Sequence, residues 1–321
     1  YDKFKEVIAP IIENDNEIYV DGKRENIKFE LVTDDLAAAV KGVNYIFVVT
    51  PAFAHESIAQ ELADCIEEHQ IVILHPGRTG GALEFKRIFS EKGKENIIAE
   101  TNTLLFACRK ASPIDISIYG TKKQVGVAAI PSSSSQYVTD ILNSYLPHFY
   151  NSESVLSTSL SNIGAIFHPV PFLFNLSRVE NKQEFRFYHE GITPAIANLL
   201  ERLDEERLEI AKNFGLNLLS AKEWLNENYH IDGNSLYEAI QMNESYQEIT
   251  APLDVKSRYV MEDIPMGLVP IKELAEIVEM EPKLIRSIIS LASTIYNIDF
   301  EVIGRNRRRM GLTPDIIDLL V

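Results

Sequence analysis

Residues 71–85, IVILHPGRTGGALEF, hold an apolar run, a glycine-rich turn and the start of a helical pattern. Four consecutive apolar residues predict a strand buried on both faces, because a strand with one solvated face alternates apolar and polar residues. The turn offers backbone N–H groups to an anion just before a helix, but glycines also serve a tight turn that binds nothing. This stretch predicts one strand–turn–helix unit of a parallel sheet.

The same alternation of strands and helices continues on both sides of this unit. Strands are predicted at 27–32, 44–50, 71–75 and 96–100, with a β-rich region at 116–131. Helices are predicted between them at 34–42, 51–69 and 82–93. This order predicts a doubly wound parallel sheet of the Rossmann type over residues 1–155.

Residues 156–321 have a different pattern, with long helical periods and almost no strand signal. The clearest helix is at 193–215, with Pro194 in its first turn and Gly215 at its end. Further helical stretches lie at 235–249 and 269–297, and Pro282 begins a new helix within the second. The chain is therefore predicted to join an α/β domain to an all-α domain.

Composition excludes several classes of partner. The net charge of −16 over 321 residues argues against binding to nucleic acid or to an anionic membrane, since both require a basic face. The basic run at 305–309, RNRRR, is predicted to form a solvated or salt-bridged surface. No apolar run approaches the roughly 20 residues that span a bilayer. Two cysteines imply no disulfide framework and favour a reducing cytoplasm.

The nucleotide-binding part of the predicted Rossmann domain is incomplete. The motif G-x-G-x-x-G occurs nowhere, and we expect about 30 preceding residues to carry the first strand, the phosphate loop and the second strand. Asp2 then takes the place of the ribose-binding acid, which favours NAD over NADP, although Lys3 and Lys5 weaken that preference. Thr50 and Pro51, after the strand at 44–50, are further candidates for cofactor binding.

Five segments in sequence resemble the opine dehydrogenases, the octopine/nopaline dehydrogenase family. They are HPGRTGGALEF (75–85), AETNTLLFACR (99–109), GAIFHPVPFLFN (164–175), FYHEGITPAIANLLERLDEERLEIAKNFG (187–215) and SRYVMEDIPMGLVP (257–270). The resemblance implies a Rossmann domain followed by a helical domain. It also implies an NAD(P)H-dependent, reversible condensation of an α-keto acid with the amino group of an amino acid.

The resemblance implies that His168 is the catalytic acid–base group, and an imidazole titrates near neutral pH. Pro169 and Pro171 interrupt the helical hydrogen bonds around it, so the ring is expected to project from a bend. In the family an aspartate orients this histidine, which here points to Asp263, with Glu262 as the adjacent competitor. Taken alone, the histidine also fits a satisfied core position, and Asp263 also fits a helix cap.

Substrate carboxylates call for cations, and the bidentate fork of arginine suits them. Arg258 lies five residues before the aspartate, while Arg78 and Arg109 follow predicted strands on the cofactor side. Thr103 and Cys108 resemble family positions near the nicotinamide and substrate. Cys108 is not expected to act as a nucleophile, since the reaction needs no covalent thiol step.

Tyr188 and Glu190 are placed at the border of the substrate cleft or in a structural loop. The other six histidines show no metal-ligand spacing, so no metal site is predicted. The competing interpretations are another two-domain dehydrogenase, such as a ketopantoate reductase or a 3-hydroxyacid dehydrogenase, and a non-catalytic nucleotide-binding protein. A helical domain of this size is also compatible with a homodimer.

Overall fold

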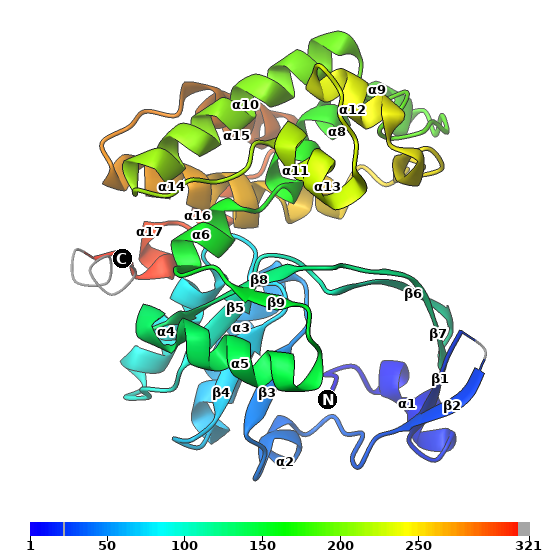
Figure 1. The fold of residues 1–321 in the computed structure, drawn as a ribbon, viewed down its shortest axis with the longest axis vertical. Coiled ribbons are helices and arrows are strands. Elements are labelled where there is room, and N and C mark those ends of the chain that lie inside the picture. Colours follow the sequence, from blue (N-terminus) through cyan, green and yellow to red (C-terminus); the bar gives the residue numbers. More distant parts are fainter. Residues whose placement is uncertain (22, 314–321) are drawn as a thin grey trace.

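The computed structural model describes residues 1–21 and 23–313 of the chain. Figure 1 shows an α/β half, which contains the N-terminus, and a helical half above it. The main sheet of the α/β half has the strand order β3-β4-β5-β8-β9. Its strands are β3 (Tyr45–Val48), β4 (Ile71–Leu74), β5 (Ile98–Thr101), β8 (Val125–Ile130) and β9 (Phe149–Asn151).

The main sheet is mixed, so the expectation of an entirely parallel sheet needs one correction. β3, β4 and β5 are parallel to one another, as are β8 and β9, but β5 and β8 pair antiparallel. β8 is reversed because a β-hairpin, rather than a crossover helix, separates it from β5. β3 and β4 are connected by α3 (His55–Cys65), which follows the short turn η1 (Ala52–Ala54), and β4 and β5 are connected by α4 (Gly81–Glu91), while α2 (Leu36–Val40) precedes β3.

The predicted strand at 44–50 is shorter than expected and is not buried on both faces. β3 lies at the edge of the sheet, with β4 as its neighbour among the described strands. Phe47 is 49% exposed and Val49 is 59% exposed, because no described element covers this side of β3. An apolar run therefore identified the strand correctly but not its surroundings.

A second sheet extends from the body as an arm, which Figure 1 shows on the right of the molecule. Its order is β2-β1-β7-β6, formed by β1 (Glu17–Val20), β2 (Lys23–Lys28), β6 (Phe106–Ser112) and β7 (Asp115–Thr121), with α1 (Lys5–Glu13) beside β1. The strand predicted at 27–32 ends at Lys28 and pairs antiparallel with β1, outside the main sheet. Residues 29–31 are exposed and have no buried face to hold them in a strand.

The helical half contains no named strand among its described residues, and a single bridge joins Arg186 to Thr250. α10 (Pro194–Asn213) matches its prediction, and the Thr193 side chain caps it. The stretch at 235–249 forms only α12 (Leu236–Met242) and the turn η3 (Glu244–Tyr246). The other helices are α6 (Val155–Leu160), α7 (Gly164–Phe167), α8 (Pro169–Phe174), α9 (Leu176–Glu180), α11 (Ala221–Tyr229), α13 (Arg258–Met261), α14 (Val269–Ile277), α15 (Lys283–Tyr296), α16 (Phe300–Ile303) and α17 (Arg307–Met310).

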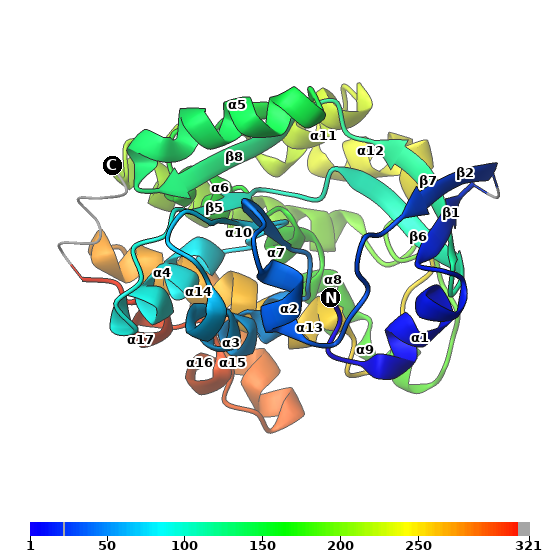
Figure 2. The same ribbon diagram turned by 90° about the horizontal axis from the view of Figure 1, so that it is seen from below.

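The two halves share one hydrophobic core. Val72, Leu74 and Ile98, on one face of the sheet, belong to a buried cluster that continues through α4 into the helical half. The opposite face, with Ile71 and Ile73, packs against α5 (Ser135–Tyr145), which Figure 2 shows lying along β8. Burial of a continuous apolar core is the main stabilising contribution to folding, so it holds the halves together.

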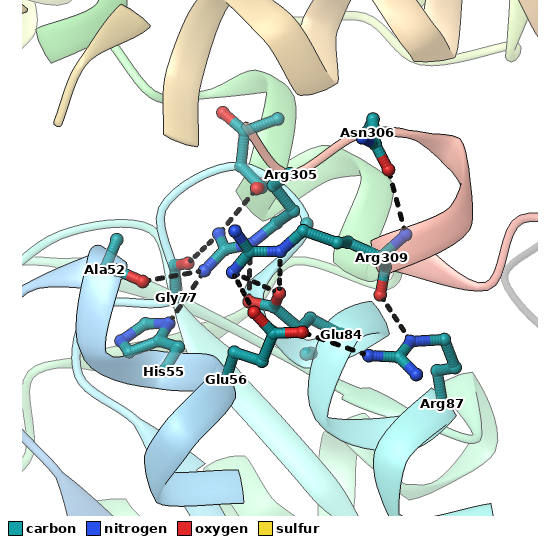
Figure 3. A network of polar contacts seen from close by, with 12 residues as sticks. Ala52, His55, Glu56, Gly77, Glu84, Arg87, Arg305, Asn306 and Arg309 are labelled. Carbon is teal, nitrogen blue, oxygen red and sulfur yellow. Dashed lines mark hydrogen bonds and ion pairs between the residues drawn. The ribbon is translucent and has the colours of Figure 1, made fainter. Parts of the chain in front are cut away.

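The basic run at 305–309 is partly buried, which corrects the prediction of a surface cluster. Arg305 is fully buried and Arg309 is 8% exposed, whereas Arg307 and Arg308 are exposed. Both buried guanidinium groups bind the carboxylate of Glu84 in α4, with Arg305 Nε 2.9 Å from Oε2 and Arg309 Nε 2.6 Å from Oε1. Figure 3 shows this Glu84 cluster, meaning Glu84, Arg305 and Arg309, between the C-terminal segment and α4.

Within residues 1–21 and 23–313, no helix is long and apolar enough to cross a membrane.

Candidate active site

His168 lies at the junction of α7 and α8, as the two neighbouring prolines predict. Pro169 occupies the first position of α8, where its missing N–H costs no helical hydrogen bond. The imidazole projects toward the segment after α13, and its Nδ1 lies 2.7 Å from Oδ2 of Asp263. Two residues 95 positions apart thus form a histidine–aspartate pair.

Asp263, rather than Glu262, is the partner of the imidazole. Glu262 is occupied elsewhere, since its carboxylate accepts hydrogen bonds from Arg258 Nε at 2.5 Å and from Ala52 N at 3.3 Å. Asp263 precedes the π-helical turn η4 (Ile264–Leu268), but its side chain makes no capping bond there. Burial raises the pKa of the Asp263 carboxyl, yet the adjacent His168 and nearby arginines outweigh burial and bring that pKa below its usual value. Asp263 is therefore a carboxylate near neutral pH.

Two tyrosines complete the surroundings of the imidazole. The hydroxyl of Tyr188 lies 3.2 Å from His168 Nε2, and burial raises the pKa of this phenol well above 10. The phenol therefore stays protonated and donates to Nε2, which leaves the Nδ1 proton of a neutral ring for Asp263. Tyr259 stacks on the imidazole with ring centroids 4.3 Å apart. The ring is held in one plane with Nε2 as its basic nitrogen.

Arg78 brings a cation from the α/β half to this pair. It lies in the glycine loop, residues 76–81, with φ of 57°. Its Nε is 3.6 Å from Glu262 Oε1 and its Nη1 is 4.0 Å from Asp263 Oδ1. The two halves of the molecule therefore meet at the predicted site.

Backbone N–H groups at the glycine loop donate hydrogen bonds to side chains of the protein itself, which leaves these groups unavailable to an anion. Gly80 N donates to Ser159 Oγ at 2.9 Å, and Ala82 N donates to Glu100 Oε2 at 2.8 Å. A Cβ on Gly77 would overlap the Glu100 side chain, and Gly80 has φ of 74°. These contacts favour the structural interpretation of the glycines, a tight turn packed against the helical half.

A cavity of about 1930 Å³ lies between the arm and the helical half, beside the histidine–aspartate pair. Thr103, Cys108 and Arg109 line it from the α/β half, and Arg258 and Tyr259 line it from α13. Since Tyr259 stacks on the imidazole, the pair lies directly behind the cavity wall. Four of the predicted substrate residues thus line one cavity, whereas Arg78 is not among its lining residues.

Two of the predicted cofactor residues, Thr50 and Pro51, lie just beyond the carboxyl end of β3, at the edge where open α/β sheets bind nucleotides. Thr50 Oγ1 is buried without a hydrogen-bond partner among the described residues. Asp2 lies before α1, and its carboxylate accepts a hydrogen bond from Phe4 N at 2.9 Å. A buried hydroxyl that lacks a partner at this edge fits a polar ligand such as a dinucleotide.

Four residues near the site have no clear signal in the sequence. Lys122 lines the cavity, Tyr259 covers the histidine, Glu100 is a fully buried carboxylate and Arg305 binds the glycine loop. Glu100 and Tyr259 stand inside segments that the resemblance singled out, whereas Lys122 and Arg305 do not. Glu190, also considered at the cleft, instead accepts a hydrogen bond from Arg186 N. Within the described part of the chain, no group of three or more His, Cys, Asp or Glu side chains is placed to hold a metal ion.

Comparison with known proteins identifies a family and a shared fold. Residues 151–296 match the family model described as NAD/NADP octopine/nopaline dehydrogenase, alpha-helical domain. An opine dehydrogenase of Arthrobacter sp. (strain 1C) is 40% identical over 88% of this chain and 79% of its own length. A solved octopine dehydrogenase with NADH and L-arginine has a TM-score of 0.77 at 23% identity, over 97% of this chain and 87% of that chain. A ketopantoate reductase from Ralstonia eutropha has a TM-score of 0.59 at 11% identity, covering 92% and 89%.

Proposed function

This chain belongs to the octopine/nopaline dehydrogenase family, and we propose that His168 and Asp263 serve as the acid–base pair of its reaction. The family reaction is the reversible, NAD(P)H-dependent condensation of an α-keto acid with the amino group of an amino acid. The enzyme is thus an NAD(P)-dependent oxidoreductase that acts on CH–NH donors. The observation that supports the roles of the pair is the 2.7 Å contact between His168 Nδ1 and Asp263 Oδ2.

The pair moves protons during the formation of the carbon–nitrogen bond. Neutral His168 accepts a proton at Nε2 from the substrate ammonium, which frees the amine to add to the keto carbonyl, and the imidazolium returns that proton to the departing hydroxyl when the carbinolamine loses water to become an iminium. Asp263 holds the ring in the Nδ1–H form and stabilises its charged form. The hydrogen bond between the Tyr188 hydroxyl and Nε2 must break before Nε2 can take a substrate proton. At 3.2 Å this hydrogen bond is weak.

Cationic side chains bind and orient the substrates. Arg258 lines the cavity and bears a side chain that is 61% exposed, so its guanidinium can donate hydrogen bonds to a substrate carboxylate while it remains bonded to Glu262. Arg109 is a further candidate in the cavity wall, together with Thr103 and Cys108, and Arg78 is a candidate beside Glu262 and Asp263.

The cofactor, NAD(P)H, supplies the hydride that reduces the imine carbon. We assign Thr50, Pro51 and Asp2 to the cofactor-binding edge. We also assign NAD rather than NADP as the cofactor, because a carboxylate at position 2 repels a 2′-phosphate. Lys3 and Lys5, which would weaken that preference, are ion-paired with Glu61 and Asp34.

A panel of amino acids crossed with keto acids, with NADH absorbance as the readout, tests the activity. We expect NADH oxidation with at least one pair and a loss of about 10²-fold or more in kcat for His168→Ala. Full activity of His168→Ala would overturn the assigned role of the pair. No NADH oxidation with any pair would favour a non-catalytic nucleotide-binding protein.

The domain boundary is placed near residue 155, because β9 ends at Asn151 and α6 begins at Val155. The location is proposed to be cytoplasmic, which cell fractionation tests. A homodimer is proposed on the size of the helical half, and light scattering of the purified protein tests it.

A further inference from the structure

Lys122 stands at the cofactor edge of the cavity without an ionic partner. It follows β7, and its ammonium donates a hydrogen bond to Thr103 Oγ1. This hydroxyl is the only hydrogen-bond partner of the ammonium among residues 1–21 and 23–313, and no carboxylate of those residues lies within ion-pair distance of it. An ammonium has three donors, so two of them remain for a ligand.

The surroundings of Lys122 are poor in water and already positive. Burial, followed by the charge of Arg78, lowers the pKa of Lys122 to about 8. The nearby His75 is neutral near pH 7, since its Nε2 accepts from Leu105 N at 3.0 Å and burial lowers its pKa to about 4, so it does not compensate the charge of Lys122. The carboxylates closest to Arg78 belong to Glu262 and Asp263, which are already bound to Arg258 and His168. An anion that enters the cavity here meets an uncompensated cation.

We propose that Lys122 binds the carboxylate of the α-keto acid substrate. The hydride is delivered to the former carbonyl carbon of the keto acid, so this substrate must lie against the nicotinamide, and therefore at the carboxyl ends of the parallel strands. Lys122 and Thr103 stand at that edge, whereas Arg258 belongs to the helical half. The inference rests on the proposed function and assigns one of its two substrates to a subsite.

The pH dependence of substrate binding follows from this arrangement. A bound carboxylate favours the charged ammonium, so binding is strong below the pKa of free Lys122 and is lost as the pH rises through about 8. We expect the KM for the keto acid to rise above that pH in the unmodified enzyme, measured at saturating amino acid. Lys122→Arg keeps its charge and should show no such rise up to pH 10.

Lys122→Met removes the charge and is expected to raise the KM for the keto acid by about 10- to 100-fold, the range for losing one charged hydrogen bond. This KM should be independent of pH, and the KM for the amino acid should change little. Lys110→Met, on the exposed part of β6 outside the cavity, is the matched control. Near-ultraviolet circular dichroism checks that each variant is folded. If Lys122→Met is not folded, the pH dependence of the KM for the keto acid in Lys122→Arg provides the test.

Three outcomes would overturn the assignment. One is an unchanged KM for the keto acid in Lys122→Met, and a second is an increase confined to the KM for the amino acid. The third is a rise in KM above pH 8 that persists in Lys122→Arg. Each presupposes measurable activity of the unmodified enzyme, whose absence would instead contradict the proposed function.

Discussion

The carboxylate of Asp263 contacts two basic side chains, those of His168 and Arg78. It accepts a hydrogen bond from His168, and the guanidinium of Arg78 lies 4.0 Å from its other oxygen. Its side chain is 5% exposed, so water contributes little to its solvation. In such a site, removal of the negative charge affects the ring that the carboxylate holds more than it affects the packing.

Asp263→Asn tests this role at nearly constant volume. An amide can accept from Nδ1 but cannot stabilise the imidazolium, so we expect kcat to fall by about 10²- to 10⁴-fold. Steady-state kinetics measure the fall, and Glu209→Gln, an exposed acid on α10, controls for the change from acid to amide. A kcat within twofold of the unmodified enzyme would mean that Asp263 only fills space.

The sequence predicts the members of this pair but not their environment. His168 and Asp263 belong to motifs whose prolines are local signals, and these motifs suffice to place a bend. Nothing local distinguishes Lys122 from Lys123, because which lysine is buried depends on how β7 turns into β8. Arg305 looks like surface for the same reason, since its partner Glu84 is 221 positions away.

At the scale of elements, the glycine loop positions Arg78. Arg305 donates to the carbonyl oxygens of Gly77 at 3.3 Å and Thr79 at 2.7 Å, on either side of Arg78. The backbone N–H of Arg305 also donates to Pro265 O at 2.8 Å, in the segment that follows Asp263. One residue thus holds the loop and the segment whose side chains meet in the site.

Gly80→Ala is expected to destabilise this loop in two ways, by the strain of a positive φ and by a clash with Met310. Gly80 has φ of 74° and a Cβ there would overlap Met310, whereas Gly215 has φ of 76° and open space around it. We expect Gly215→Ala to cost about 1 kcal/mol of unfolding free energy and Gly80→Ala clearly more. Urea unfolding measures both, and equal costs would show that the contact with Met310 is easily relieved.

Elements differ in how far the sequence predicts them. α10 is predicted well because its cap, its first-turn proline and its final glycine are all local. The arm is not predicted, since β1 pairs with β7, a strand distant in the sequence, and most of β6 and β7 is exposed. The direction of β8 also depends on the hairpin before it rather than on its own apolar run.

At the scale of the whole molecule, the Glu84 cluster joins the C-terminal segment to the α/β half. Figure 3 shows Arg305 and Arg309 converging on Glu84 and, beside it, Glu56. The Glu84 and Arg305 side chains are both fully buried. Loss of one partner from a buried ion pair leaves an uncompensated charge, which is far more costly than loss of an exposed pair.

Glu84→Gln is therefore expected to lower the unfolding free energy by about 3–5 kcal/mol. The control is Glu91→Gln in the same helix, whose side chain is 61% exposed and pairs with Arg87 in an i,i+4 arrangement. For that pair we expect a cost of only about 0.3–0.5 kcal/mol. Urea denaturation of both variants provides the comparison, and similar costs would contradict a structural role for the Glu84 cluster.

The wide separation of Glu84 from its two arginines affects how the protein is made. The ribosome completes α4 long before it adds Arg305 and Arg309, so the nascent α/β half carries a carboxylate that has no guanidinium to enclose it. N-terminal domains generally fold first during synthesis. Here the Glu84 carboxylate of the first half acquires both arginine partners only after α17 has emerged from the exit tunnel.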